Sequence, residues 1–153
     1  MNSKVEILSF IIPVISIYIT YFLGSISAKT TRTTEVEKMR YETFYVPYLK
    51  YVLTAIPFLT NPHKMPNDIR EKLFSLVIEN VHLLSADETL LFSEYYFSFS
   101  NFVTGKINQD SENQYDEIFI KFLLATLSEA EKLSKSLGYP NLSKNISKMI
   151  FFQ

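Results

Sequence analysis

Residues 114–137 read QYDEIFIKFLLATLSEAEKLSKSL, and this stretch decides the fold class. Its apolar residues recur in steps of three and four, the spacing that places side chains on one face of an α-helix. Glycine follows at position 138 and proline at 140, two residues that commonly end helices. The stretch therefore predicts a long bundle helix whose inward face is formed by Tyr115, Phe119, Phe122, Thr126, Ala130, Leu133 and Leu137.

Four further helices are predicted from the same periodicity and from capping signals. Thr34 and Glu37 have the spacing of a capping box, in which each side chain binds the free N–H of the other residue. Ser85 and Glu88 repeat this spacing, with Gly105 as the stop, and Asn67 is a candidate cap for another helix. The predicted helices cover residues 35–58, 68–82, 85–103 and 143–152, with polar stretches at 29–34 and 106–113.

Composition limits the class of protein. The chain has 153 residues, of which 47% are hydrophobic and 20% charged, so it is long enough for one folded core and too apolar for a disordered chain. A formal net charge of -1 provides no overall field for nucleic acid, so we expect no nucleic-acid partner. The absence of cysteine excludes disulfides, thiol catalysis and thiolate metal sites. Only three glycines argue against a glycine-rich phosphate loop.

Residues 7–28 read ILSFIIPVISIYITYFLGSISA and contain no charged residue. At a helical rise of about 1.5 Å per residue, about twenty apolar residues cross a hydrocarbon core of roughly 30 Å. Pro13 is tolerated in such a helix where neighbouring groups satisfy the freed carbonyl. The stretch therefore predicts a single transmembrane anchor in the lipid bilayer, with anchoring residues Ile7, Phe10, Ile11, Ile15, Ile19 and Phe22.

Two other interpretations of residues 7–28 are open. A cleaved signal peptide would use Lys4 as its basic start and residues 25–27 as its cleavage site, leaving a secreted or cell-surface helical domain. The apolar stretch exceeds the roughly 7–15 residues of a signal peptide, and Glu6 disturbs the basic start. A buried core helix is disfavoured because the stretch has no polar face. We therefore expect a retained anchor.

The basic residues that flank this stretch predict its orientation, because cytoplasmic flanks are enriched in Lys and Arg. Lys4 and the α-amino group precede the stretch, whereas five basic residues follow it: Lys29, Arg32, Lys38, Arg40 and Lys50. We expect a single-pass protein of the cell membrane with its N-terminus outside and its C-terminal domain in the cytoplasm. The predicted fold is all-α, with an anchor at 1–28, a linker at 29–34 and a compact four- to five-helix bundle at 35–153.

Side chains that could support catalysis or metal binding show no motif spacing. His63 and His82 are the only histidines, and neither has partners at HExxH or similar spacing. Asp87 and Glu88 follow His82 but begin the next predicted helix, so a histidine at a helix end is the simpler interpretation. The sequence contains neither GxSxG nor SxxK. We expect no enzyme activity, no metal and no cofactor.

Residues 40–48 read RYETFYVPY. The stretch resembles a motif of a basic residue, an aromatic residue, Glu, an aromatic pair and Pro that follows the single transmembrane helix in small uncharacterised proteins of low-GC Gram-positive bacteria and their phages. The resemblance covers the predicted anchor and this helix, and it implies a membrane-tethered helical domain without assigning any activity or functional residue. Taken alone, the stretch predicts an amphipathic helix that Pro47 kinks or divides, because proline offers no N–H to the carbonyl of Thr43.

The predicted helix at 85–103 has aromatic residues on nearly all sides. Steps of 100° place Phe92, Tyr95, Phe99 and Phe102 together and place Phe97 on roughly the opposite side. One bundle-facing stripe covers only about 100° of a helix. Either this helix is central and covered on both sides, or Tyr96 and Phe97 form a contact surface for a protein partner or a homo-oligomer.

These features favour a non-enzymatic binding or regulatory module at the inner face of the cell membrane. Tethering supports this class because it raises the effective concentration of a weak binder against other membrane proteins. Immunity against an incoming phage or plasmid is one hypothesis within the class, by analogy alone. An enzyme with an unfamiliar site is the alternative class. A small oligomeric channel is disfavoured because one span joined to a large domain is unusual for it.

Overall fold

The computed structural model describes residues 20, 23–25, 27, 30–105 and 109–151, with only the backbone of Phe151. The chain divides into two compact units, Met1–Val36 and Glu37–Gln153. Every regular element in the described ranges is a helix, which confirms the predicted all-α class. None of the helices in these ranges is long and apolar enough to cross a membrane. The predicted anchor lies almost wholly outside them, as do its named residues Ile7, Phe10, Ile11, Ile15, Ile19 and Phe22.

In the first unit, residues 30–36 are helical, so the prediction that a helix begins at Glu35 is wrong. The Thr34 hydroxyl donates a hydrogen bond of 3.0 Å to the carbonyl of Thr30. Thr31 does the same toward Ser27 at 3.0 Å. A threonine inside a helix can return its hydroxyl to the carbonyl four residues earlier, and here this bond replaces the predicted capping box.

The second unit begins with helical residues 37–40, followed by the π-helix η1 (Tyr41–Tyr45) and α2 (Val46–Ala55). In η1 the Val46 N–H donates to the carbonyl of Tyr41, five residues earlier. Pro47, near the start of α2, would crowd the carbonyl of Thr43 in a regular α-helix. The wider turn accommodates the proline, so Pro47 divides the helix into a π and an α segment without ending it.

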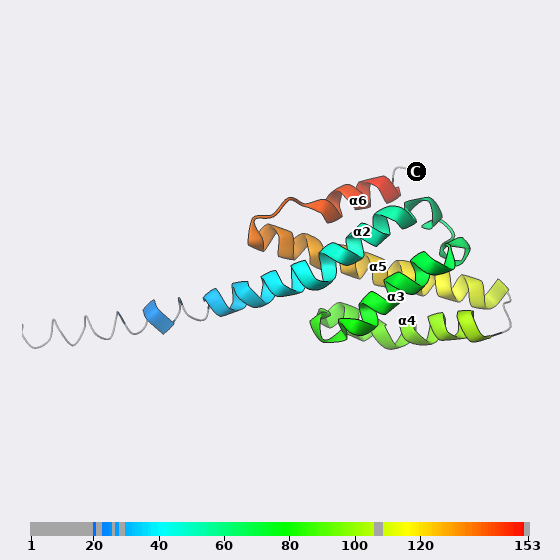
Figure 1. Cartoon of the computed structure of the whole chain (residues 1–153), viewed down its shortest axis with the longest axis horizontal. Coiled ribbons are helices and arrows are strands. Elements are labelled where there is room, and N and C mark those ends of the chain that lie inside the picture. The colour runs from blue at the N-terminus through cyan, green and yellow to red at the C-terminus, as the bar shows by residue number, and fades with distance from the viewer. Residues whose placement is uncertain (1–19, 21–22, 26, 28–29, 106–108, 152–153) are drawn as a thin grey trace, which may run out of the picture. The chain divides into compact units, whose positions relative to one another are not determined.

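The remaining elements form an up-and-down bundle in which consecutive long helices run in opposite directions (Figure 1). Helix α5 lies in the middle, contacts α4 most extensively and also contacts α6, η1 and η3. The elements after α2 are η2 (Ile56–Phe58), η3 (Pro62–Lys64), α3 (Asn67–Glu79), η4 (Val81–Leu83), α4 (Ala86–Thr104), α5 (Gln109–Leu137) and α6 (Leu142–Phe151).

Two predicted helix ends are confirmed. The Glu88 N–H donates to Ser85 Oγ at 3.3 Å and the Ser85 N–H donates to Glu88 Oε2 at 2.7 Å, which completes a capping box at the start of α4. Gly138 ends α5 with a φ of 69°, a left-handed conformation that glycine adopts without strain. The Tyr139 N–H then donates to the carbonyl of Ser134 at 2.8 Å, as in a Schellman motif.

Two other predicted starts are wrong. Helix α3 starts at Asn67 itself, whose side chain accepts from Arg70 and makes no cap. Helix α5 starts at Gln109, so residues 109–113 are helical and not loop. Asp110 and Glu112 in its first turn favour this longer helix, because acidic side chains stabilise the positive end of a helix dipole.

The core is built on the predicted face of α5 and is rich in aromatic rings. Six of the seven predicted residues on that face are buried, and Leu137 is partly buried. The Tyr95 ring of α4 stacks on the Phe122 ring with centroids 4.7 Å apart, and Phe102 stacks on Tyr115 at 4.9 Å. Rings of α4 therefore lie flat against rings of α5 along the central helix pair.

Candidate functional site

The histidine of η3 is held by an aspartate of α5. The His63 N–H donates to Asp116 Oδ1 at 2.6 Å, and the His63 Nδ1 atom lies 2.6 Å from Asp116 Oδ2. The other ring nitrogen, Nε2, lies 3.9 Å from Oε2 of Glu112, one turn earlier on α5. Asp116 therefore orients the imidazole and leaves its Nε2 atom facing Glu112.

A buried arginine lies beside this histidine. Arg70 of α3 is 5% exposed, and its guanidinium carbon lies 4.5 Å from the centroid of the Phe102 ring. Its nitrogens donate to neutral oxygens, the carbonyl of His63 at 3.3 Å and the side-chain carbonyl of Asn67. The ion pairs in the described part of the chain include none with Arg70. The aromatic face and these oxygens therefore replace a carboxylate as its partners.

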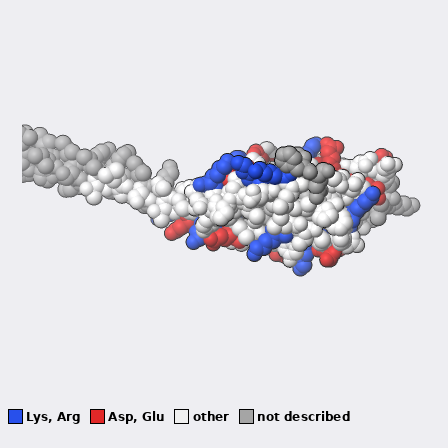
Figure 2. Space-filling model, turned by 90° about the horizontal axis from the view of Figure 1, so that it is seen from above, with Lys and Arg blue, Asp and Glu red and all other residues white. Residues whose placement is uncertain are grey.

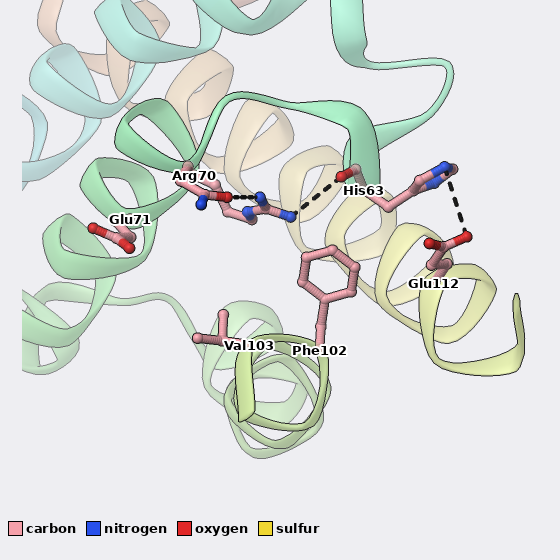
Figure 3. Close-up of a pocket in the computed structure, with 7 residues that line it drawn as sticks. His63, Arg70, Glu71, Phe102, Val103 and Glu112 are labelled. Atoms are coloured by element: carbon pink, nitrogen blue, oxygen red, sulfur yellow. Dashed lines mark hydrogen bonds and ion pairs between the residues drawn. The ribbon is translucent and has the colours of Figure 1, made fainter. Parts of the chain in front are cut away.

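These side chains border a cavity of about 280 Å³ (Figure 3). In Figure 3 the Phe102 ring points toward Arg70, and Glu71 and His63 lie at opposite ends of the group. Helices α3, α4 and α5 and the short η3 all contribute to this border. The lining residues are His63, Asn67, Arg70, Glu71, Phe102, Val103 and Glu112.

The chemistry available to this cavity follows from its lining. The Nε2 atom of His63 can form a hydrogen bond with a bound molecule, and Asp116 holds the orientation of the ring through Nδ1. None of the seven lining residues carries a hydroxyl or thiol that could attack a substrate. Within the described ranges, no group of three or more His, Cys, Asp or Glu side chains could hold a metal ion.

Sequence reasoning missed the partners of His63 because they lie far along the chain. Asp116 is 53 residues away, and Glu112 falls in a stretch predicted to be a loop. The α-helical start at Gln109 places both carboxylates on one face of α5, four residues apart. The second histidine, His82, is exposed on η4. An acidic first turn was the available signal for the longer α5 and hence for this cluster.

The outer face of α4 carries exposed apolar side chains. Phe97 is 64% exposed and Tyr96 is 44% exposed. The described part of the chain therefore leaves Phe97 uncovered, whereas the central-helix alternative required it to be covered on both sides. Leu90 and Val103, also exposed, lie seven residues from Phe97 and Tyr96 respectively and so fall on the same side. We call Leu90, Tyr96, Phe97 and Val103 the α4 surface.

The rings of the α4 surface continue into the core. Phe97 contacts Tyr96 edge-on with centroids 5.9 Å apart, and Tyr96 contacts Phe74 of α3 at 5.8 Å. Phe74 in turn stacks on the buried Phe99 at 3.7 Å. The exposed rings are therefore supported by packed rings, which reduces the conformational entropy that a binding partner would have to remove.

No family model matches the chain, and neither a curated protein nor a solved structure matches it. Its function therefore has to be inferred from its own residues.

Proposed function

We propose that the chain is a membrane-anchored helical module that binds another protein through the α4 surface. The observation that carries this proposal is the exposure of Phe97 together with Leu90, which is 77% exposed. Several large apolar side chains on one exposed face are typical of an interaction site, whereas single exposed apolar residues are common on protein surfaces. Glu94 is the only charged residue between positions 89 and 104, so the face has little charge to desolvate on binding.

The anchor supports a binding role for so small a domain. Residues 7–28 contain no charged residue and have the length of a membrane-spanning helix. Anchoring restricts the domain to the membrane surface, where even a weak contact with another membrane protein becomes populated. The basic residues after position 28 favour a domain in the cytoplasm.

Photo-crosslinking from the α4 surface tests the proposed contact. A photoreactive amino acid replaces Phe97 in the full chain, and a matched variant carries it at Lys50, an exposed residue of α2. We expect an adduct with a second polypeptide from position 97 and none from position 50. Phe97→Ser should then abolish adducts formed from position 90 while leaving the melting temperature nearly unchanged. Equal crosslinking from positions 97 and 50 would contradict the proposal.

Membrane fractionation tests the anchor separately. The full chain should remain with membranes after carbonate washing, because a spanning helix inserts almost irreversibly. A reporter that works only in the cytoplasm should be active when fused after Gln153. A mature protein that begins near Lys29 and is found in the medium would contradict the anchor.

A second candidate function, proton transfer to a small molecule in the cavity, is favoured by the pairing of His63 with Asp116. The test compares thermal melting in the presence and absence of a small-molecule cell extract. A rise in melting temperature that is lost in His63→Gln and kept in His82→Gln would support this function, because His82 is exposed on η4. Equal shifts in all three proteins, or none, would reject it.

A further inference from the structure

Charge is separated along the chain although the net charge is close to zero. Residues 68–131 contain twelve acidic and four basic residues. Residues 132–153 contain no Asp or Glu and four lysines: Lys132, Lys135, Lys144 and Lys148. We call these four residues the lysine surface. The net charge of -1 conceals this basic segment. In the fold, carboxylates from elsewhere in the sequence lie against its α5 end, so its unpaired positive charge is on α6.

All four lysines are exposed, and Lys144 lies near enough to Glu131 of α5 to interact with it electrostatically. On α5, Lys132 lies 3.5 Å from Glu129 and Lys135 lies 2.7 Å from Glu131. The ion pairs found within the described ranges do not include Lys144 or Lys148 of α6. Figure 2, which views the bundle from the side that α6 occupies in Figure 1, shows basic side chains gathered in a band on this face.

Helix α6 holds its lysines outward because its other side is packed. Ile146 is fully buried and Ile150 packs against the core, which fixes the rotation of the helix. Lys144 and Lys148 are one turn apart on the opposite side, next to the exposed Asn145. The side of α6 that carries Ile146 and Ile150 is therefore used within the bundle, whereas Lys144, Lys148 and the half-exposed Met149 are available to a partner.

The lysine surface lies close to the point where the second unit begins. Ser136 Oγ donates a hydrogen bond of 2.6 Å to Glu37, the first residue of that unit. Tyr139, just after α5, donates one of 2.9 Å to Glu42. Eight residues lie between position 28 and Glu37, so the chain that joins these two positions spans at most about 32 Å when fully extended. The hydrogen bonds of Ser136 and Tyr139 thus place the end of α5 beside the first residues of the second unit.

We propose that the lysine surface binds the anionic headgroups of the phospholipid bilayer that holds the anchor. The inference rests on the proposed anchor, and charge complementarity selects the partner. Anionic lipids of the cytoplasmic leaflet attract basic residues that lie within about a Debye length of the membrane. Helices α6 and α4 lie on opposite sides of α5 (Figure 1). Binding through α6 therefore leaves the α4 surface turned away from lipid and open to a protein.

The test uses the full chain in vesicles and a single fluorescent label. The chain has no cysteine, so Asn145→Cys provides one labelling site next to the lysines. The vesicles contain either phosphatidylcholine alone or an equimolar mixture with phosphatidylglycerol, and both carry the same lipid with a quencher in its headgroup. We expect stronger quenching in the phosphatidylglycerol vesicles and its loss in about 1 M salt, where the Debye length is only about 3 Å.

Two double variants separate the lysine surface from a general charge effect. Each lysine near an anionic membrane contributes roughly a fivefold factor, so Lys144→Gln with Lys148→Gln should lower the docking equilibrium constant roughly 30-fold. The matched control, Lys72→Gln with Lys121→Gln, removes two exposed lysines elsewhere and should behave like the parent chain. Circular dichroism melting checks that both variants remain folded.

The outcomes distinguish this inference from the proposed anchor. A chain that resists carbonate washing but is quenched equally in both kinds of vesicle would overturn the lysine surface and keep the anchor. A chain that is released by carbonate yet sediments only with phosphatidylglycerol vesicles would overturn the anchor and keep the lysine surface. Release from both kinds of vesicle without any preference would overturn both.

Discussion

The hydroxyl group of Tyr45 donates a hydrogen bond of 2.6 Å to Oε2 of Glu88, a side chain with no exposed surface. The same oxygen accepts the N–H of Ser85, and a guanidinium nitrogen of Arg40 donates to the Tyr45 hydroxyl at 3.2 Å. One buried carboxylate thus connects the π-helical turn to the start of α4. A capping residue that normally stabilises one helix here also joins two.

Tyr45→Phe removes the hydroxyl from this network, and we expect a loss of about 1–3 kcal/mol in the free energy of unfolding. Tyr95→Phe is the matched control, because the buried Tyr95 hydroxyl has no hydrogen-bond partner within the described ranges. Its removal should be nearly neutral or slightly stabilising. Urea denaturation of the two variants measures the difference. Equal losses would mean that the Glu88 bond contributes nothing specific.

The Arg40 side chain joins three segments, namely the helical residues 37–40, η4 and α5. We call these contacts the Arg40 clasp, and Arg40→Met removes them. The Arg40 side chain donates to the carbonyl of Leu83 at 2.8 Å and pairs with Glu129 of α5 at 3.2 Å, where both side chains are mostly buried. We expect a loss of about 1–3 kcal/mol, because a partly buried carbonyl and carboxylate lose their donor. Lys121→Met, which breaks an exposed pair with Glu117, should leave the denaturation midpoint unchanged. Similar midpoints for both variants would rule out the clasp.

Phe122→Ala should cost about 3–5 kcal/mol, the usual result of truncating a buried Phe. The ring is fully buried and stacks on Tyr95. Leu124→Ala, at a residue that is 40% exposed on the same helix, should cost less than about 1 kcal/mol. Chemical denaturation of both proteins provides the comparison, and a small effect at position 122 would contradict the assigned inward face of α5.

Alkaline pH should unfold the bundle cooperatively. Burial raises the pKa of Tyr48, Tyr95 and Tyr115 above the usual value of 10.0. The unfolded chain loses these protons near pH 10 while the folded chain keeps them. Stability is therefore fully present below about pH 10 and falls above it, by about 1.4 kcal/mol per pH unit for each tyrosine.

Tyrosinate absorbance and helical circular dichroism, recorded together from pH 8 to 12, measure this effect. The absorbance of the buried tyrosines should rise in the same step in which the helical signal is lost. A full rise in absorbance while the helical signal persists would show that the three hydroxyl groups ionise in the folded state, contrary to their burial.

The elements that the sequence predicted correctly are those with local causes. The inward face of α5 follows from apolar spacing, and the capping box of Ser85 and Glu88 lies within four residues. Gly138 ends a helix because of its own backbone freedom. The predicted helix starts at Glu35 and Gln114 were wrong. The threonine-rich residues before Glu35 and the acidic residues before Gln114 are polar and were assigned to loops, although both stretches are compatible with a helix.

The cluster around His63 could not be predicted because it depends on tertiary packing. Its carboxylate partners come from a helix that is separated from η3 by α3 and α4 in the sequence. Arg70 gave no signal either, since one arginine on an amphipathic helix usually faces solvent. Phe97 differs, because helical geometry alone placed it opposite the core-facing aromatics, and the structure leaves it exposed.

The π-helical turn contains one residue more than an α-helical path between the same two ends. Deletion of Thr43, an exposed residue of this turn, would restore α-helical spacing and rotate residues 37–40 by about 100° around the helix axis. Arg40 would then point away from Glu129. The additional residue thus sets the direction in which Arg40 points from its helix. A deletion or insertion of one residue in this turn is therefore enough to abolish or create the Arg40 clasp.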